Sequence, residues 1–308
     1  MTSKQEVLAY EERWSKPAGI AALLAIVLLV ASLIVGSQIS GGSGTAEQLI
    51  EVNRHTSIQM FSSVLLALGF ILLIAPLYFL FRAARARSDR VRRQLVGVVI
   101  VGPLFFAAAS VVLGMATVEG AETFVEDKVP ALEREHVKLD SDKANEKAED
   151  AFSEGSLAGL GVGLKFAGLI GFVAGFLYTS LWAMRVGLLT RFWGSLGIAL
   201  AAVSVFFFQF ALLWFVYLGL LLLGLVRGGR PPAWQSGEAE PWPTPGEKAA
   251  QQMGKGPDPG TPGRAASPSE EASQSDDSRP SEGEAFAGED ALKEEPSEGP
   301  PKKRKQRG

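Results

Sequence analysis

The stretch SLAGLGVGLKFAGLIGFVAGF, residues 156–176, is almost entirely apolar, yet a single lysine, Lys165, lies near its middle. It belongs to one of four long apolar runs, which cover residues 18–39, 58–81, 95–118 and part of 157–184. No run contains an acidic residue, and only the fourth contains a base. A helix needs about 20 apolar residues to cross a bilayer core about 30 Å thick, and a buried soluble helix of that length would carry a polar stripe. The runs predict an all-α, polytopic transmembrane helix bundle.

Lys165 has two interpretations. Residues 166–184 are nearly long enough to cross alone, so a span over 164–184 places Lys165 at the outer edge, where its stem reaches the headgroups. Alternatively, Lys165 lies in a polar cavity between helices and pairs with an acid. The nearest acids, Glu119 and Glu122, follow the third run, and we therefore favour the interface.

A fifth apolar tract, residues 192–226, is harder to interpret. As one helix its 35 residues would measure about 52 Å, at 1.5 Å per residue. Its only strongly polar side chain is Gln209. We expect two short spans, 193–207 and 211–226, with a tight turn near Gln209; one long tilted helix is the alternative.

The loop after the second run sets the predicted orientation. It holds one acid, Asp89, against six arginines: Arg82, Arg85, Arg87, Arg90, Arg92 and Arg93. Since basic short loops mark the cytoplasmic side, residues 1–17 are expected to be cytoplasmic and the acidic loop 119–156 extracytoplasmic. Arg227 and Arg230 follow the last apolar run. They favour a cytoplasmic tail and hence six spans; five spans are the alternative.

The tail, residues 227–308, is rich in Pro, Ser, Gly and Glu, a composition that predicts disorder. Trp234 and Trp242 could anchor its start at the inner interface. It ends in the basic block PPKKRKQRG, for which contact with anionic lipid is expected rather than specific nucleic-acid binding.

Small residues and prolines suggest how the helices pack. Glycines recur every fourth residue in two sets: Gly155, Gly159 and Gly163, then Gly171 and Gly175. Such spacing allows close helix approach, either within the bundle or in a homo-oligomer. Pro76 and Pro103 should kink the second and third helices.

No catalytic or metal-binding pattern is found in the sequence. The chain has no cysteine, which excludes disulfides, thiolate metal sites and a cysteine nucleophile. The apolar runs contain no Asp, Glu or His, so no buried acid–base pair can be built there. We expect no cofactor and no enzymatic activity.

Residues 184–198 (MRVGLLTRFWGSLGI) and 228–247 (GGRPPAWQSGEAEPWPTPGE) resemble a group of uncharacterised multi-pass membrane proteins from high-GC Gram-positive (actinobacterial) bacteria. The hydropathy pattern is also weakly similar to six-helix membrane families of unknown function. In the actinobacterial group a short proline-bearing turn separates two helices, whereas this chain has residues 206–210 (FFFQF) instead. The resemblance implies no activity.

The sequence thus predicts a protein of a bacterial inner membrane, with the lipid bilayer as its first partner. The favoured function is non-enzymatic: structural, regulatory or interaction-based. A small-solute transporter or channel is the alternative, for which polar or broken helices near the membrane midplane would be expected. A membrane enzyme ranks third.

Overall fold

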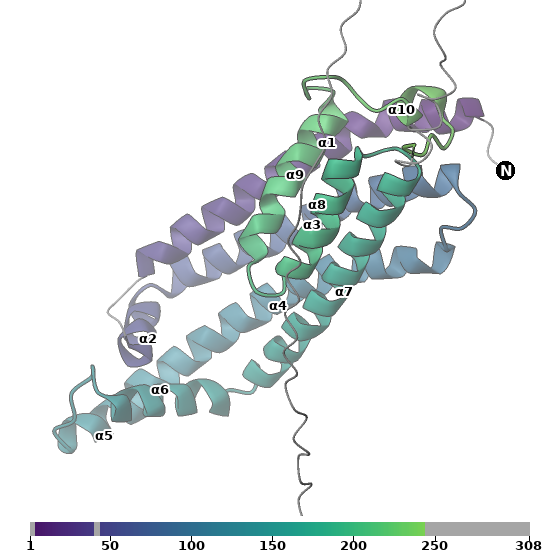
Figure 1. Cartoon of the computed structure of the whole chain (residues 1–308). Coiled ribbons are helices and arrows are strands. Elements are labelled where there is room, and N and C mark those ends of the chain that lie inside the picture. The colour runs from purple at the N-terminus through teal and green to yellow at the C-terminus, as the bar shows by residue number, and fades with distance from the viewer. Residues whose placement is uncertain (1–3, 40–43, 244–308) are drawn as a thin grey trace, which may run out of the picture. The chain divides into compact units, whose positions relative to one another are not determined.

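The computed structural model describes residues 4–39 and 44–243, and their regular secondary structure is entirely helical. Four helical segments in this part of the chain are long and apolar enough to cross a membrane. They are built on α1 (Lys4–Gly36), α3 (Thr56–Arg87), α4 (Val96–Thr123) and α7 (Ala158–Arg185) (Figure 1). The prediction of a helical bundle with four long apolar helices is confirmed.

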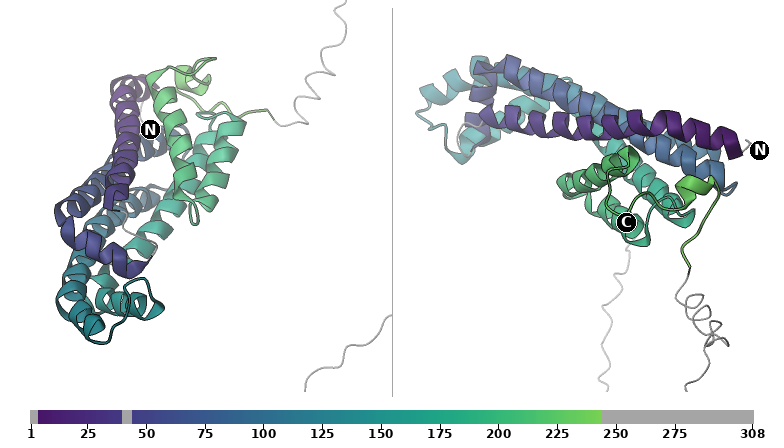
Figure 2. Two further views of the ribbon diagram at one scale, coloured as in Figure 1. Left: turned by 90° about the vertical axis from the view of Figure 1, so that its left-hand side faces the viewer. Right: turned by 90° about the horizontal axis from the view of Figure 1, so that it is seen from above.

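The long helices pack in the order α1, α3, α4, α7, and two shorter helices lie against the outer members of this row. The shorter helices are α8 (Arg191–Val203), which contacts α7, and α9 (Phe208–Leu223), which contacts α1. Figure 2 shows this arrangement from two further sides. Large buried side chains fill the interior, including Trp214, Phe172 and Phe176. Pro76 and Pro103 are both buried within continuous helices.

Glycines bring α4 and α7 close together. A Cβ atom added at Gly102 would lie 2.2 Å from the backbone nitrogen of Phe172, and one added at Gly171 would lie 2.9 Å from the Cα of Gly102. Gly175 lies against Val99 in the same way, at 3.0 Å. Any larger side chain would therefore force the two backbones apart.

The other predicted glycine set does not take part in this contact. Gly155 caps α6 and precedes α7, and Gly159 and Gly163 have no atom within 4 Å of an added Cβ. The residue that contacts α4 here is Gly161, which lies against Leu113. Positions two apart on a helix differ by about 200°. The face of α7 that contacts α4 is therefore roughly opposite to Gly159 and Gly163. These two glycines do not pack against α4 within the chain, and their role in a homo-oligomer stays a prediction.

Helices α1 and α3 are longer than the predicted spans 18–39 and 58–81. Their 33 and 32 residues correspond to about 50 and 48 Å, well beyond a core of about 30 Å. The extra length includes residues 4–17 of α1 and residues 82–87 of α3, which meet at one end of the bundle. Residues 1–17 were expected only as a segment before the helix, and the described part of them is helical.

The opposite end carries a small cap with its own core. It consists of α2 (Thr45–Arg54), a π-helical turn (Phe124–Lys128), α5 (Val129–Arg134) and α6 (Asp142–Glu154). Ala46, Leu49, Phe124 and Leu132 are among its buried residues. The Asn145 side chain accepts a hydrogen bond from the backbone N–H of Ala46 at 3.1 Å. We call this the outer cap, after the side on which the acidic loop 119–156 was expected; the sequence predicted that loop but not a folded cap.

The tract 192–226 folds as two helices rather than one, with the break at residues 204–207. The predicted turn near Gln209 is therefore misplaced, since Gln209 lies in the first turn of α9 and is exposed. The chain turns without a polar loop because the end of α8 tightens. The backbone N–H groups of Phe206 and Phe207 both donate to the carbonyl of Val203.

Residues 230–243 pack on the bundle, so the predicted disordered tail does not begin at residue 227. The short helix α10 (Ala233–Ser236) buries Ala233 and Trp234. The indole N–H groups of Trp234 and Trp242 donate to the carbonyls of Leu188 and Leu189 at 2.9 and 2.8 Å. Both tryptophans thus anchor this segment to the turn between α7 and α8. The remainder of the predicted tail, including PPKKRKQRG, lies outside the described residues.

Candidate functional site

The arginines of residues 82–93, from which the orientation was predicted, lie at the end of the bundle opposite the outer cap. The start of α1, the end of α3, the start of α4, the α7–α8 turn and residues 230–243 meet there, and we call it the arginine end. It contains a buried ion pair between Arg87 and Glu11, whose side chains are 0 % and 5 % exposed. A buried pair of this kind is strongly destabilising if one partner is removed, since the other charge is then left unpaired.

Every donor of Arg87 has a partner. Its two terminal nitrogens each donate to one carboxylate oxygen of Glu11, the second at 3.0 Å. Its Nε donates to the carbonyl of Ala233 at 3.1 Å, which also accepts from Nη2 at 2.6 Å, and Nη1 donates to the carbonyl of Ala83 at 3.0 Å. A guanidinium has five N–H groups, and all of them are used. Arg87 is therefore a structural residue that ties α1, α3 and α10 together.

Arg230 makes a second connection. Its Nε donates to the carbonyl of Leu221 at 3.1 Å and its Nη2 to that of Leu222, which are C-terminal carbonyls of α9. A cation here complements the negative end of the helix dipole. Burial lowers the pKa of the Arg230 guanidinium, and the Glu11 carboxylate partly offsets this. The ring centroid of Trp234 lies 5.7 Å from Cζ of Arg87 and 5.8 Å from Cζ of Arg230.

An open cavity of about 1030 Å³ lies between the extensions of α1 and α3, and Glu11 and Arg87 are among the residues that line it. We call it the arginine pocket. Its basic and aromatic lining residues are Lys4, Tyr10, Tyr78, Phe81, Arg82, Arg85, Arg87 and Arg93, and its acidic ones are Glu6, Glu11, Asp89 and Glu238. Its volume lies at the upper end of the range of about 300–1,000 Å³ usual for ligand sites.

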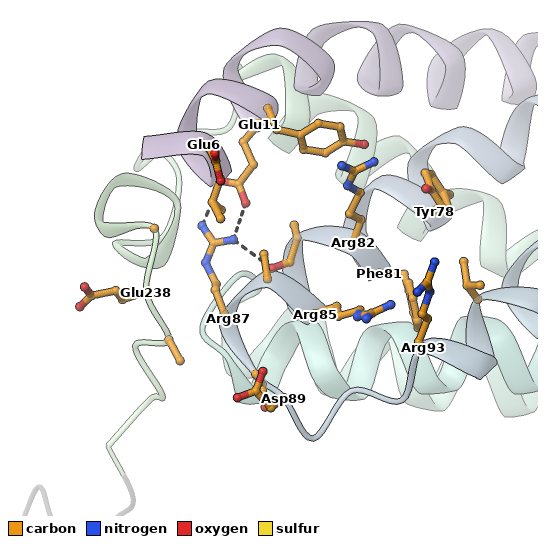
Figure 3. Close-up of a pocket in the computed structure, with 18 of the residues that line it drawn as sticks. Glu6, Glu11, Tyr78, Phe81, Arg82, Arg85, Arg87, Asp89, Arg93 and Glu238 are labelled. Atoms are coloured by element: carbon orange, nitrogen blue, oxygen red, sulfur yellow. Dashed lines mark hydrogen bonds and ion pairs between the residues drawn. The ribbon is translucent and has the colours of Figure 1, made fainter. Parts of the chain in front are cut away.

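The charges in the arginine pocket are divided between two sides. Figure 3 shows Arg82, Arg85 and Arg93 together on one side with Tyr78 and Phe81, and the labelled acids on the other. On the acidic side, Glu11 pairs with Arg87 and Glu238 with Lys4, the latter at 3.2 Å. On the basic side, the guanidinium groups of Arg85 and Arg93 have no ion pair or hydrogen bond within the described residues.

Arg82 is held by an aromatic ring. Its Cζ lies 3.9 Å from the ring centroid of Tyr10 on α1, well inside the range of a cation–π contact. Burial raises the pKa of the Tyr10 phenol, although Arg82 partly offsets this. The ring is therefore neutral at physiological pH and presents its face to the guanidinium. Tyr10 thus fixes Arg82 at the rim of the pocket.

Three guanidinium groups at one cavity wall form an arrangement suited to an anion. Arginine offers a planar set of donors that matches phosphate and carboxylate oxygens in pairs. Arg82 and Arg85 are three residues apart on α3 and so share a face of the helix, while Arg93 comes from the short 3-10 turn Arg93–Leu95 before α4. Arg90 and Arg92 belong to the same loop but do not line the pocket.

The other candidates from the sequence do not form a site. Lys165 is exposed on α7 and has no ion pair among the described residues. Gln209 is exposed on α9. Within residues 4–39 and 44–243, no three His, Cys, Asp or Glu side chains are placed to hold a metal ion.

The sequence analysis did not identify Glu11 or Tyr10 as site residues. Both belong to residues 1–17, for which only a cytoplasmic location was predicted. Comparison of the chain with protein families, with curated proteins and with solved structures finds no match. The arginine pocket is therefore interpreted from its own geometry.

Proposed function

We propose that this chain is a non-enzymatic, multi-pass protein of a bacterial inner membrane whose arginine end faces the cytoplasm and binds a phosphate-bearing anion. The main supporting observation is the contrast among the arginines at the end of α3 and in the turn before α4. Arg87 uses all of its donors internally, whereas Arg85 and Arg93 line a cavity without an acceptor among the described residues. A regulatory or interaction role follows from reversible occupation of this pocket.

The orientation in this proposal rests on charge and on the position of residues 230–243. Basic residues favour the cytoplasmic side, and the arginine end carries six arginines, three at the end of α3 and three in the connection from α3 to α4. The start of α1 and residues 230–243 meet at this end through the Lys4–Glu238 pair. An even number of crossings is therefore proposed. The six-span version counts α8 and α9 as two short spans, whereas a four-span version counts neither.

Two sources of the phosphate are compatible with a pocket at the membrane surface: the headgroup of an anionic phospholipid, or a soluble phosphate. A basic pocket between helices on the cytoplasmic side is typical of lipid headgroup sites. The lining of the arginine pocket also includes apolar side chains, such as Val96 and Ile100 of α4. We therefore favour the lipid headgroup.

The test uses the full chain in two settings. In detergent, binding of inorganic phosphate and pyrophosphate is measured by calorimetry. In nanodiscs of phosphatidylcholine, association of spin-labelled phosphatidylglycerol is compared with that of spin-labelled phosphatidylcholine. Preferential association of phosphatidylglycerol, weakened by millimolar pyrophosphate, supports the lipid headgroup. Tight phosphate binding without a lipid preference assigns the pocket to a soluble phosphate. Absence of both contradicts the proposal.

A further inference from the structure

The two short helices form a hairpin that is too short to cross a membrane twice. Helix α8 has 13 residues and α9 has 16, which correspond to about 20 and 24 Å. The hydrocarbon core is about 30 Å thick. The connection between the helices, residues 204–207, adds only one tight turn.

Both open ends of the hairpin are fastened at the arginine end. Arg191 begins α8 and donates to the carbonyl of Pro243 at 3.4 Å, and Arg230 caps the end of α9. The rings of Trp193 and Tyr217 stack at 3.6 Å and hold the helices together near that end. The depth that the hairpin reaches can therefore be measured from the arginine end toward its tip.

Aromatic contacts give one measure of depth. The ring of Phe208, at the start of α9, lies 5.2 Å from Phe70 of α3, 6.1 Å from Phe106 of α4 and 5.4 Å from Phe172 of α7. Phe70 and Phe106 lie at the middle of the apolar runs 58–81 and 95–118, and Phe172 lies at the middle of α7. The tip thus reaches only the midpoint of three long apolar helices.

Helix α1 gives a second, separate measure. Gly219 of α9 lies against Gly19 of α1, where an added Cβ on Gly19 would be 3.0 Å from the Gly219 carbonyl oxygen. Gly19 lies at the start of the first apolar run. Phe208 is eleven residues before Gly219, so it lies about 17 Å deeper along α9. That distance is about half of a core of about 30 Å.

The chemistry of the tip fits hydrocarbon rather than water. Phe206 is 81 % exposed and Phe207 57 %, and Val205 and Phe210 are also exposed. The backbone N–H groups of residues 204–207 all donate to carbonyls in the last turns of α8, and the Ser204 hydroxyl donates to the Ala201 carbonyl at 2.7 Å. These N–H groups therefore need no water as a partner, which lowers the cost of placing the turn at membrane depth.

We propose that α8 and α9 form a re-entrant hairpin that enters and leaves the membrane at the arginine end. Its tip, residues 205–210, contacts lipid acyl chains at the middle of the bilayer. The described part of the chain, residues 4–39 and 44–243, then makes four complete crossings, and the count remains even. This inference rests on the proposed membrane location, but it does not depend on which side of the membrane the arginine end faces or on what the arginine pocket binds.

The test exploits the absence of cysteine from the chain. Spin labels are placed singly at Phe206→Cys and Phe210→Cys, both exposed positions, in the full chain reconstituted in liposomes. Ser153→Cys of the outer cap and Arg90→Cys of the arginine loop, both exposed, serve as references for the two surfaces. Collision of each label with oxygen and with a water-soluble nickel complex is measured by electron paramagnetic resonance. Labelling by a membrane-impermeant maleimide is measured from each side.

The expected result is that both tip labels collide with oxygen, not with nickel, and that neither cysteine reacts with the maleimide from either side. Labelling of the tip from the outer-cap side, with nickel collision like that at position 153, would overturn the hairpin in favour of six spans. Protection from oxygen as well would mean that a second protein copy covers the tip, which overturns the lipid contact. If positions 153 and 90 react from opposite sides and the tip from neither, the hairpin stands whichever end of the bundle faces the cytoplasm.

Discussion

Arg87 and Glu11 lie 76 residues apart in the chain, and their side chains form a two-pronged ion pair that is almost completely shielded from solvent. The pair joins the end of α3 to the start of α1, and the carbonyl of Ala233 completes it from the segment after α9. One guanidinium therefore connects three parts of the sequence, and it also lines the arginine pocket.

Removing that guanidinium is expected to destabilise the protein. Arg87→Met leaves the Glu11 carboxylate buried without a partner and should lower the free energy of unfolding by about 3–5 kcal/mol. The measurement is thermal unfolding of the full chain in detergent. The control is Arg90→Met, which removes the same charge from an exposed position and should leave the melting temperature unchanged.

The second control separates an unpaired charge from lost packing. The double variant Glu11→Leu/Arg87→Met removes both charges, and it should recover much of the stability lost in Arg87→Met. Equal melting temperatures for Arg87→Met and the wild type would contradict the structural role given to this pair.

The close contact of α4 and α7 predicts opposite effects for two glycines. Gly102→Ala places a methyl group 2.2 Å from the backbone nitrogen of Phe172, and such overpacking should cost about 1–3 kcal/mol. Gly159→Ala adds the same methyl group in open space on α7 and should be neutral or slightly stabilising. Unfolding temperatures of both variants test this, and destabilisation by Gly159→Ala but not Gly102→Ala would reverse the assigned faces.

Arg230 is expected to hold residues 230–243 on the bundle. Arg230→Gln removes the charge that caps the carbonyls of Leu221 and Leu222, and the segment should become more sensitive to limited proteolysis. Arg227→Gln is the matched control, because Arg227 precedes it by three residues and is exposed. Identical cleavage rates in both variants would show that the cap does not anchor this segment.

The position of residues 230–243 beside the start of α1 predicts a specific cross-link. In the cysteine-free chain, Lys4→Cys/Glu238→Cys should be joined by a short bismaleimide, since the native side chains approach to 3.2 Å. The pair Lys4→Cys/Ser153→Cys, which combines the arginine end with the outer cap and also lies on both sides of the cleavage sites, should remain unlinked. The product is detected as two fragments held together after protease cuts the outer cap. Efficient linkage of the control pair alone would refute the even number of crossings.

The sequence predicted the bundle well because apolar length is a local property. Runs such as 95–118 need only about 20 apolar residues to specify a crossing helix, and no distant partner is involved. The extension of α1 back to Lys4 was missed because its polar residues give no hydropathy signal. They are stabilised as a helix by contacts with the end of α3, such as Arg82 over Tyr10.

The sequence showed which arginines lie near the site but not which of them form it. The arginines of residues 82–93 stood out as a group, yet they were all read as one topology signal. Nothing local distinguishes Arg87, which is buried against Glu11, from Arg85, which lines the pocket, or from Arg90, which does neither. That distinction depends on partners far away in the chain. The face of a glycine set and the position of the turn between α8 and α9 depend on packing in the same way.

The most direct test of the arginine pocket compares two double variants with the same charge. Arg85→Gln/Arg93→Gln removes two residues that line the pocket, and Arg90→Gln/Arg92→Gln removes two that do not. The preference for spin-labelled phosphatidylglycerol over phosphatidylcholine is measured for each in nanodiscs. At about 1 kcal/mol for each arginine near an anionic surface, the first variant should lose about tenfold or more of the preference, and the second should keep most of it. Equal losses in both variants would mean that the arginines act only as a diffuse positive surface, which would contradict a defined anion site.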